Sequence, residues 1–225
     1  MDQETAELLS RKLHIAKDQI VREEYEMIFL QGLLASKLSD RLIFKGGTAL
    51  RLAYGSPRFS EDLDFALSSK IKQKEFRECV KRIVEPLPTV SIKDLREKHY
   101  THFALLGVKE PYLRQAFSVK IEVSKRPVRW KKGKDFVSQT CKSEVVLLES
   151  VGLVTTLKRA FLDKKRAIKS REKARDLFDL WWLGGKLEKE VSFKLSETKL
   201  ARVRSELNPF LPEHMKRVVD SWRKK

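Results

Sequence analysis

The sequence predicts an α+β fold in which a mixed sheet, flanked by helices, is followed by a helical C-terminal part. Short apolar or alternating segments bounded by Gly and Pro dominate residues 40–142 and are typical of strands. From about residue 144 onward apolar residues recur with helical spacing instead. We therefore predict two domains, residues 1–142 with the sheet and residues 143–225, whose helices close over a cleft.

The N-terminal elements follow from local spacing. Between residues 5 and 38 most apolar positions are three to five apart, which predicts one or two amphipathic helices. DRLIFKGG, residues 40–47, is expected to form a short buried strand that ends at glycines. TALRLAYG, residues 48–55, predicts a short helix stopped by glycine. DLDFAL, residues 62–67, predicts a second strand.

The middle of the chain alternates one helix with several strands. Residues 70–84 carry an apolar stripe at i, i+3, i+4, i+7 and i+8 that stops before Pro86, so a helix should pack on the sheet there. Strands are expected over 89–95, 101–108 and 115–124, and the last, AFSVKIEVSK, alternates strictly. Residues 135–140 predict one more short strand.

The C-terminal part reads as helices throughout. Expected helices span Ser143 to Leu162 and Ser170 to Leu183. Shorter helices should fill 192–222, with a break at Asn208-Pro209.

Composition limits the class of protein. Hydrophobic residues make up 41% of the 225, which is enough to bury a core. No apolar run approaches the roughly 20 residues that span a bilayer, and the acidic N-terminus lacks a signal peptide, so we expect a cytoplasmic protein. Cys79 and Cys141 lack metal-site spacing and should be reduced.

The chain is strongly basic. Lys and Arg number 48 against 31 Asp and Glu, a formal charge of +17. Such an excess favours a polyanionic partner, nucleic acid first. Ion-pair networks of a hyperthermophile also raise charged content, but they need balanced signs, which this chain does not have.

Two acids lie one residue apart in the expected strand 62–67. Asp62 and Asp64 would share one face of that strand, with Leu63 and Phe65 on the other. Carboxylates this close raise each other's pKa unless a cation lies between them, and Mg²⁺ prefers oxygen ligands. Glu122, on the alternating strand, could lie beside them. Three such acids can hold two metal ions for phosphoryl or nucleotidyl transfer, although each motif alone is commonly a solvated surface.

A glycine pair precedes the acids. Gly46, Gly47 and Thr48 lie between a predicted strand and helix, where backbone N–H groups can bind phosphate oxygens. Lys45 and Arg58 add positive charge close by. The same glycines also suit an ordinary turn and helix cap.

Together, K-GGT-A-L, R-F-S-E-D-L-D-F and K-I-E-V resemble the polymerase-β-like nucleotidyltransferase superfamily, most closely its AbiEii/AbiGii-type enzymes. The resemblance covers about residues 40–183 and implies a nucleotidyltransferase-like fold. It implies that Mg²⁺ binds Asp62 and Asp64, with Glu122 as the third acid. It assigns the nucleotide triphosphate to Gly46, Gly47 and Thr48, and it implies that Arg58 and Ser60, which match the positions before the acid pair, brace that pair. With Lys45 and Lys158, which can reach the triphosphate, these residues form the expected nucleotide site.

The helical part carries the family's remaining elements. TTLKRAFLDKKR and EKARDLFDLWWL resemble them, which implies roles in catalysis for Lys158 and Asp176. Without the resemblance, Asp176 would be read as half of a salt bridge with Arg175 or Lys173. The family often has Asp where this chain has Glu122, and by spacing Asp94 and Asp135 are poorer substitutes.

Two basic runs flank the inferred cleft. KRPVRWKKGK spans 125–134 and KKRAIKSREKAR spans 164–175, and such clusters bind phosphates while Trp can stack on a base. Runs of this kind are also ordinary solvated surface. The candidate nucleic-acid contacts are Lys125, Arg126, Arg129, Trp130, Lys131, Lys132, Lys164, Lys165, Arg166 and Lys169.

These patterns favour a Mg²⁺-dependent nucleotidyltransferase that moves a nucleoside monophosphate from an NTP to an acceptor, with RNA indicated by the basic runs. The resemblance implies the tRNA 3′ end as target, a role as toxin in toxin–antitoxin or phage defence, and a separately encoded antitoxin. Two alternatives remain. One is a metal-dependent nuclease, whose Glu-x-Lys strand motif is missing here, and the other is a nucleic-acid-binding module without activity.

Overall fold

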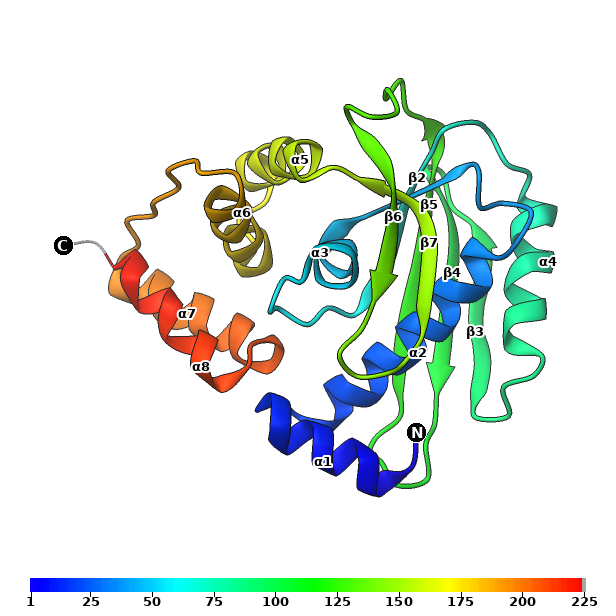
Figure 1. Cartoon of the computed structure of the whole chain (residues 1–225), viewed down its shortest axis with the longest axis horizontal. Helices are drawn as coiled ribbons and strands as arrows, with labels where there is room; N and C mark the ends of the chain where they lie inside the picture. The colour runs from blue at the N-terminus through cyan, green and yellow to red at the C-terminus, as the bar shows by residue number, and fades with distance from the viewer. Residues whose placement is uncertain (224–225) are drawn as a thin grey trace.

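The computed structural model describes residues 1–223 as a seven-stranded mixed sheet with helices on both faces (Figure 1). The strand order is β3-β4-β5-β2-β1-β7-β6. The strands are β1 (Leu42–Lys45), β2 (Asp62–Leu67), β3 (Val90–Glu97), β4 (Thr101–Val108), β5 (Phe117–Pro127), β6 (Phe136–Lys142) and β7 (Glu149–Thr155). The predicted α+β class is therefore confirmed.

Helices α1 (Gln3–Leu13), α2 (Lys17–Leu34) and α4 (Gln73–Val84) belong to the N-terminal part of the chain, and α2 and α4 pack together on one face of the sheet. Glycines let the backbones in this layer approach one another closely. A Cβ on Gly152 of β7 would lie 2.6 Å from Leu34, and one on Gly32 would lie 2.6 Å from Ile83 of α4. Gly152 thus lets α2 lie directly on β7, and Gly32 lets α4 pack closely against α2.

The opposite face carries α3 (Gly46–Tyr54), which lies between the sheet and the C-terminal helices (Figure 1). Those helices are α5 (Leu157–Ser170), α6 (Ala174–Lys186), α7 (Glu197–Leu207) and α8 (Glu213–Lys216), with 3₁₀ turns at Asn208–Phe210 and Arg217–Trp222. They share a second core that includes Phe178, Leu183 and Trp222. The predicted break at Asn208-Pro209 is confirmed.

The helix expected over 143–162 is wrong in its first half. Residues 149–155 form β7, which pairs parallel with β1 and antiparallel with β6, and the helix begins only at Leu157. The local pattern misleads because Val151 points outward at 63% exposure while Ser150 is buried. The sheet thus extends past residue 142, and the division into two domains stays a prediction.

Two smaller expectations have clear outcomes. Cys79 and Cys141 form no disulfide, in line with the predicted reduced state, and both are buried. Within residues 1–223, no helix is long and apolar enough to cross a membrane.

Candidate active site

Three strands place a row of charged side chains across the centre of the sheet. In the β-sheet register Lys45 of β1 is opposite Asp64 of β2, and Asp64 is opposite Glu122 of β5. Residues paired in this way point to the same face, and neighbouring strands are about 4.8 Å apart. The predicted proximity of Asp64 and Glu122 thus follows directly from the parallel pairing of β2 and β5.

A lysine lies inside this acidic group. Lys120 of β5 is opposite Asp62 in the register, and its Nζ lies 3.1 Å from Asp62 Oδ2 and 3.4 Å from Glu122 Oε2. Lys98 also reaches Glu122, at 3.5 Å. Partial burial lowers the pKa of Lys120, but the Asp62 carboxylate and its neighbours outweigh it and the net shift is upward. Lys120 therefore stays protonated and offsets the acids.

The surroundings of Asp64 disfavour its ionised form. Burial raises its pKa above the ordinary value, and Asp62 and Glu122 raise it further against the opposing charges of Lys45 and Lys120. A Cβ on Gly46 would lie 2.9 Å from Asp64 Oδ2, and Gly46 has φ +90°, where L side chains are strained. Only glycine lets the backbone come this close to the carboxylate.

The glycine pair begins α3, as predicted. A Cβ on Gly47 would lie 2.2 Å from Arg58 Nη2 and 3.0 Å from Ser60 Oγ, so both side chains border the loop. Thr48 is buried, and its hydroxyl donates to the carbonyl of Asp62. In this conformation that hydroxyl ties the start of α3 to β2.

Behind the loop lies a buried chain of ion pairs. Arg58 donates to Asp179 of α6 through Nε at 2.8 Å and Nη2 at 2.9 Å. Lys164 of α5 lies 2.6 Å from Asp179 and 2.8 Å from Asp176. Burial raises the pKa of Asp179, but Arg58 and Lys164 outweigh it and hold that pKa at about 2. Arg171 completes the charge balance at Asp176, at 3.0 Å.

The sheet and the helices enclose a cleft of about 400 Å³. Its walls include Lys45, Gly46, Gly47, Asp64, Trp130, Asp163, Lys164, Arg171 and Asp176. Asp62 and Glu122 lie next to Asp64, outside these walls. A larger hollow of about 1030 Å³ lies by the far end of α3, around Arg51 and His14, away from the acids. The smaller cleft is therefore the candidate active site, because its walls include Asp64 and the glycine pair.

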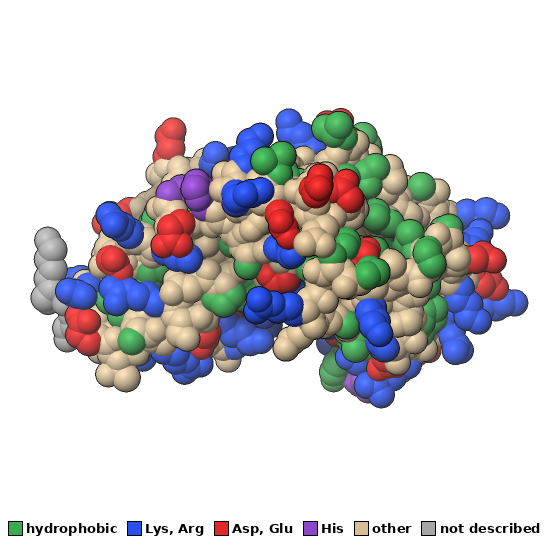
Figure 2. All heavy atoms as spheres, turned by 90° about the horizontal axis from the view of Figure 1, so that it is seen from below, with side chains coloured by type: hydrophobic (Ala, Val, Ile, Leu, Met, Phe, Trp, Pro, Cys, Tyr) green, Lys and Arg blue, Asp and Glu red, His purple; other side chains and the backbone are tan. Residues whose placement is uncertain are grey.

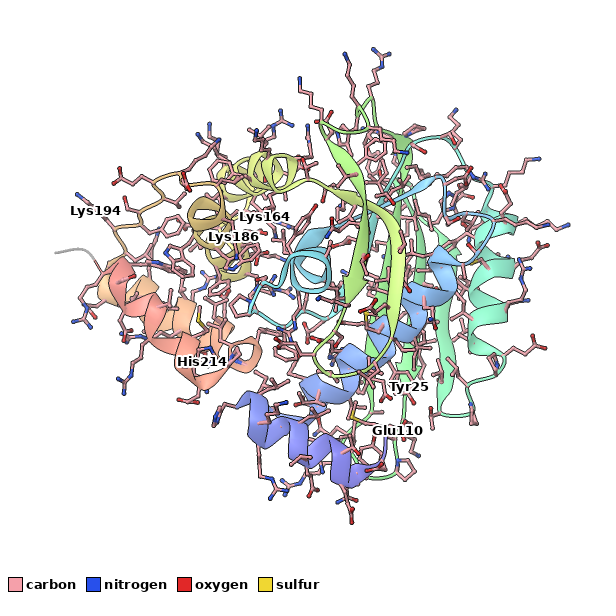
Figure 3. The ribbon with its side chains drawn as sticks, viewed as in Figure 1. Tyr25, Glu110, Lys164, Lys186, Lys194 and His214 are labelled. Atoms are coloured by element: carbon pink, nitrogen blue, oxygen red, sulfur yellow. The ribbon has the colours of Figure 1, made fainter. Side chains whose placement is uncertain are left out.

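The two candidate lysines lie differently. Lys158 is exposed on α5 and lies outside the cleft walls. Lys164, six residues later, lies between α5 and α6 and meets the two acids of α6 (Figure 3). Lys164 therefore lines the cleft and lies apart from the exposed basic run, while the role that the resemblance implies for Lys158 stays a prediction.

The remaining basic residues are spread out. Arg126, Arg129, Lys131, Lys132, Lys165, Arg166 and Lys169 are exposed. Lys125 pairs with Glu97 at 2.7 Å, and Arg159 lies 4.7 Å from the centre of the Trp130 ring. On the face drawn in Figure 2, Lys and Arg side chains are interspersed with acids. Trp130 is therefore packed against the cleft rim and a neighbouring guanidinium.

Asp94 and Asp135 do not join the acids. Asp94 lies on the edge strand β3 and pairs with Arg96 at 3.0 Å. Asp135 accepts from the backbone of Lys131 at 2.9 Å and lies 3.8 Å from Arg159. Neither substitutes for Glu122.

Sequence reasoning missed several members of the site. The sequence could have indicated Lys120, because it lies on the same face of the alternating strand as Glu122. Asp179 was not missed, because the spacing on its helix predicts that at least one of Asp176 and Asp179 faces the cleft or an arginine, and Asp179 pairs with Arg58. No local pattern indicated Lys98, since only the pairing of β3, β4 and β5 brings it to Glu122.

The acids offer oxygen donors of the kind that Mg²⁺ prefers. Asp62 and Asp64 project from one strand, and the raised pKa of Asp64 is what a nearby cation would offset. Within the described residues no three acidic, His or Cys side chains are arranged as a metal cluster, and Lys120 contacts two of the acids. The Asp pair offers two carboxylates suited to a divalent ion, and in this conformation the Lys120 ammonium lies beside Asp62 and Glu122.

Comparison with known proteins agrees with this geometry. A family model described as the AbiEii nucleotidyltransferase toxin of type IV toxin–antitoxin systems matches residues 28–216. No curated protein matches the chain.

Solved structures share the fold. A nucleotidyltransferase from H. pylori, described as putative in its published name, has TM-score 0.57 at 23% identity, covering 86% of this chain and 76% of that one. JHP933 from Helicobacter pylori has TM-score 0.56 at 23% identity, covering 86% and 74%. MenT4, a nucleotidyltransferase toxin from Mycobacterium tuberculosis H37Rv, has TM-score 0.57 at 20% identity, covering 98% and 73%.

The family match spans most of the chain and includes the glycine pair, all three acids and the paired acids of α6. The chain therefore belongs to the AbiEii nucleotidyltransferase toxins of type IV toxin–antitoxin systems.

Proposed function

We propose that this nucleotidyltransferase uses Mg²⁺ to transfer a nucleoside monophosphate from an NTP to RNA, with the tRNA 3′ end as the first acceptor to test. The observation that carries the proposal is the acid pair Asp62 and Asp64 beside the glycine pair at the start of α3. A phosphate cradle next to a carboxylate pair is what nucleotidyl transfer needs.

Each group has a defined task in this proposal. The N–H groups of Gly46 and Gly47 and the N-terminus of α3 donate to the triphosphate. Lys45 and Lys164 add positive charge at the cleft walls. Asp62 and Asp64 hold Mg²⁺, with Glu122 as the neighbouring third acid. When bound, the metal supplies charge neutralisation at the phosphates and lowers the pKa of a coordinated hydroxyl.

Arg58 and Ser60 have a supporting task. Arg58 is fully engaged with Asp179 and with the carbonyl of Phe59, at 2.8 Å. It therefore fixes the glycine loop from behind while the loop's backbone binds the nucleotide. Ser60 borders the same loop. This assigns both residues to positioning the nucleotide site.

The family also implies a partner. Type IV toxins are paired with an antitoxin, and we propose that a separately encoded antitoxin protein restrains this chain. The high positive charge, +17, supports a polyanionic acceptor. RNA satisfies that charge and presents the terminal hydroxyl that nucleotidyl transfer requires.

The test is transfer of label from each α-labelled NTP in the presence of Mg²⁺ and total tRNA, read on denaturing RNA and protein gels. The Asp62→Asn/Asp64→Asn variant is compared with Asp94→Asn, which changes an acid far from the cleft. Label on RNA with wild type and Asp94→Asn, but not with the double variant, is the expected result.

Other outcomes would redirect the proposal. Label on a polypeptide would replace RNA by protein as the acceptor. Shortened RNA without label would indicate a nuclease. RNA binding without any transfer, by a folded protein, would contradict nucleotidyl transfer to these acceptors.

A further inference from the structure

The turn between β3 and β4 presents an exposed aromatic ring. Tyr100 is 54% exposed, the highest value for any Phe, Trp or Tyr side chain among the described residues. The Arg126 guanidinium lies 4.5 Å from the centre of its ring, and the His99 ring meets it edge-on at 4.2 Å. An exposed ring beside a guanidinium is a common stacking platform for unpaired bases.

A hollow of about 590 Å³ adjoins this turn. Lys70, Lys72, Lys125 and Arg126 line it, and Glu97 is the one acid in its lining. Lys125 pairs with Glu97 at 2.7 Å, so that acid is already neutralised. The remaining cations face a space that suits phosphate groups.

The turn is joined to the catalytic acids. Lys98 Nζ lies 3.5 Å from Glu122 Oε1, and the Lys98 carbonyl accepts from Lys125 at 3.2 Å. Lys98 and Tyr100 are two residues apart, so their Cα atoms are at most about 7 Å apart. Lys98 therefore lies between Glu122 and the turn that carries the exposed ring.

We propose that Tyr100, Arg126 and the adjoining hollow bind a single-stranded segment of the acceptor RNA and direct its end toward the acids. This rests on the proposed function. An unpaired base stacks on the Tyr100–Arg126 pair, while backbone phosphates lie near Lys70 and Lys72. The strand is single because a duplex hides its base faces from a ring of this kind.

In this proposal the base stacks on Tyr100 and not on Trp130, the aromatic that the sequence favoured. Trp130 packs with Val128 and Leu153 around a small apolar cluster and lies beneath Arg159. Tyr100 was not marked by any run of basic residues, since its cationic neighbours come from three separate segments. The fold alone assembles this surface.

The test is binding of a short, fluorescently labelled single-stranded RNA of mixed sequence, measured by anisotropy over a range of salt concentrations. Tyr100→Ala is expected to weaken binding about tenfold, while Tyr100→Phe, which keeps the ring, binds like wild type. Lys70→Ala/Lys72→Ala is expected to reduce the salt slope by about one. Lys194→Ala, on the opposite side of the molecule (Figure 3), is the charge control and should bind like wild type.

Wild-type binding by Tyr100→Ala would overturn the inference, and so would equal competition by duplex RNA. The labelled-NTP assay separates the two proposals. If wild type transfers label and Tyr100→Ala does so with an unchanged KM for RNA, the proposed function stands and this surface is wrong. If wild type transfers nothing while Tyr100→Ala alone loses RNA affinity, the binding surface stands and the transfer reaction is wrong.

Discussion

Arg58 and Asp179, separated by 121 residues in the sequence, form a two-pronged ion pair in which both side chains are almost completely buried. The pair connects the loop before β2 to α6. It is a direct link between the loop that precedes the acids and the C-terminal helices.

Removing one partner of this pair should be costly. We expect Arg58→Ala or Asp179→Ala to lower the free energy of unfolding by about 3 to 5 kcal/mol, because a buried charge is left uncompensated. Arg58→Lys should recover only part of the loss, since an ammonium cannot make both hydrogen bonds. Chemical denaturation measures the effect, and losses below 1 kcal/mol would contradict it.

Asp179 also predicts a pH dependence. Its pKa falls from 3.8 to about 2 on folding, because Arg58 and Lys164 outweigh the effect of burial. The folded state therefore binds fewer protons, and the carboxylate's contribution is complete above pH 3.8 and disappears as the pH falls through about 2. The stability gap between wild type and Asp179→Asn should narrow across that window in urea melts at each pH. A gap that stays constant would refute the assignment.

Gly46 should not tolerate a side chain. Gly46→Ala places a Cβ 2.9 Å from Asp64 Oδ2 at φ +90°, so we expect a loss of about 1 kcal/mol or more in stability and severe loss of transfer activity. Gly185→Ala is the matched control, because nothing lies within 4 Å of the added Cβ and the position is helical. That variant should be neutral or slightly more stable by thermal melting.

Lys158 and Lys164, both on α5, should respond differently to substitution by alanine. Lys164→Ala leaves Asp176 and Asp179 short of a cation, so both stability and activity should fall. Lys158→Ala changes an exposed side chain, and its melting temperature should match wild type. Activity and melting curves of both variants decide the matter. Loss of activity in Lys158→Ala alone would support the catalytic role that the resemblance implies for Lys158.

Glu26 on α2 is a buried carboxylate whose Oε1 has no hydrogen-bond partner among the described residues. Burial raises its pKa well above 4.5, with a further upward contribution from Glu23. The folded state thus holds a proton that the unfolded chain releases near pH 4.5, and stability falls as the pH rises above that value.

Glu26→Gln should remove this penalty. We expect the variant to exceed wild type by roughly 1 to 3 kcal/mol at pH 8, with a smaller difference at pH 5. Glu190→Gln, at an exposed position, provides the control and should change neither value. Urea denaturation at the two pH values is the measurement, and a difference that does not grow with pH would contradict the buried-acid explanation.

Local patterns predicted the elements whose burial alternates or repeats regularly. AFSVKIEVSK became β5 because Val119, Ile121 and Val123 are fully buried on one face. Residues 70–84 became α4 for the corresponding reason with helical spacing. The strand β7 was not predicted because its parallel partner, β1, is distant in sequence and its exposed Val151 breaks the expected pattern.

Some residues of the site could likewise be predicted from local patterns, and others could not. Asp62, Asp64 and the glycine pair lie on consecutive elements, so their spacing indicated their proximity. Asp179 meets Arg58 across 121 residues of sequence, whereas Lys164 meets α6 from the preceding helix and Lys98 meets Glu122 from another strand. No local pattern distinguishes Lys164 and Lys98 from surface charges.

The position of β7 beside β1 has a consequence during synthesis. The sheet cannot be completed before residues 149–155 leave the ribosome, and the Arg58–Asp179 link needs α6 as well. A nascent chain that has exposed only the acids and the glycine pair therefore lacks a formed cleft. Such a toxin gains its active site only after most of its length has been translated, and the cell making it has that interval to supply the antitoxin.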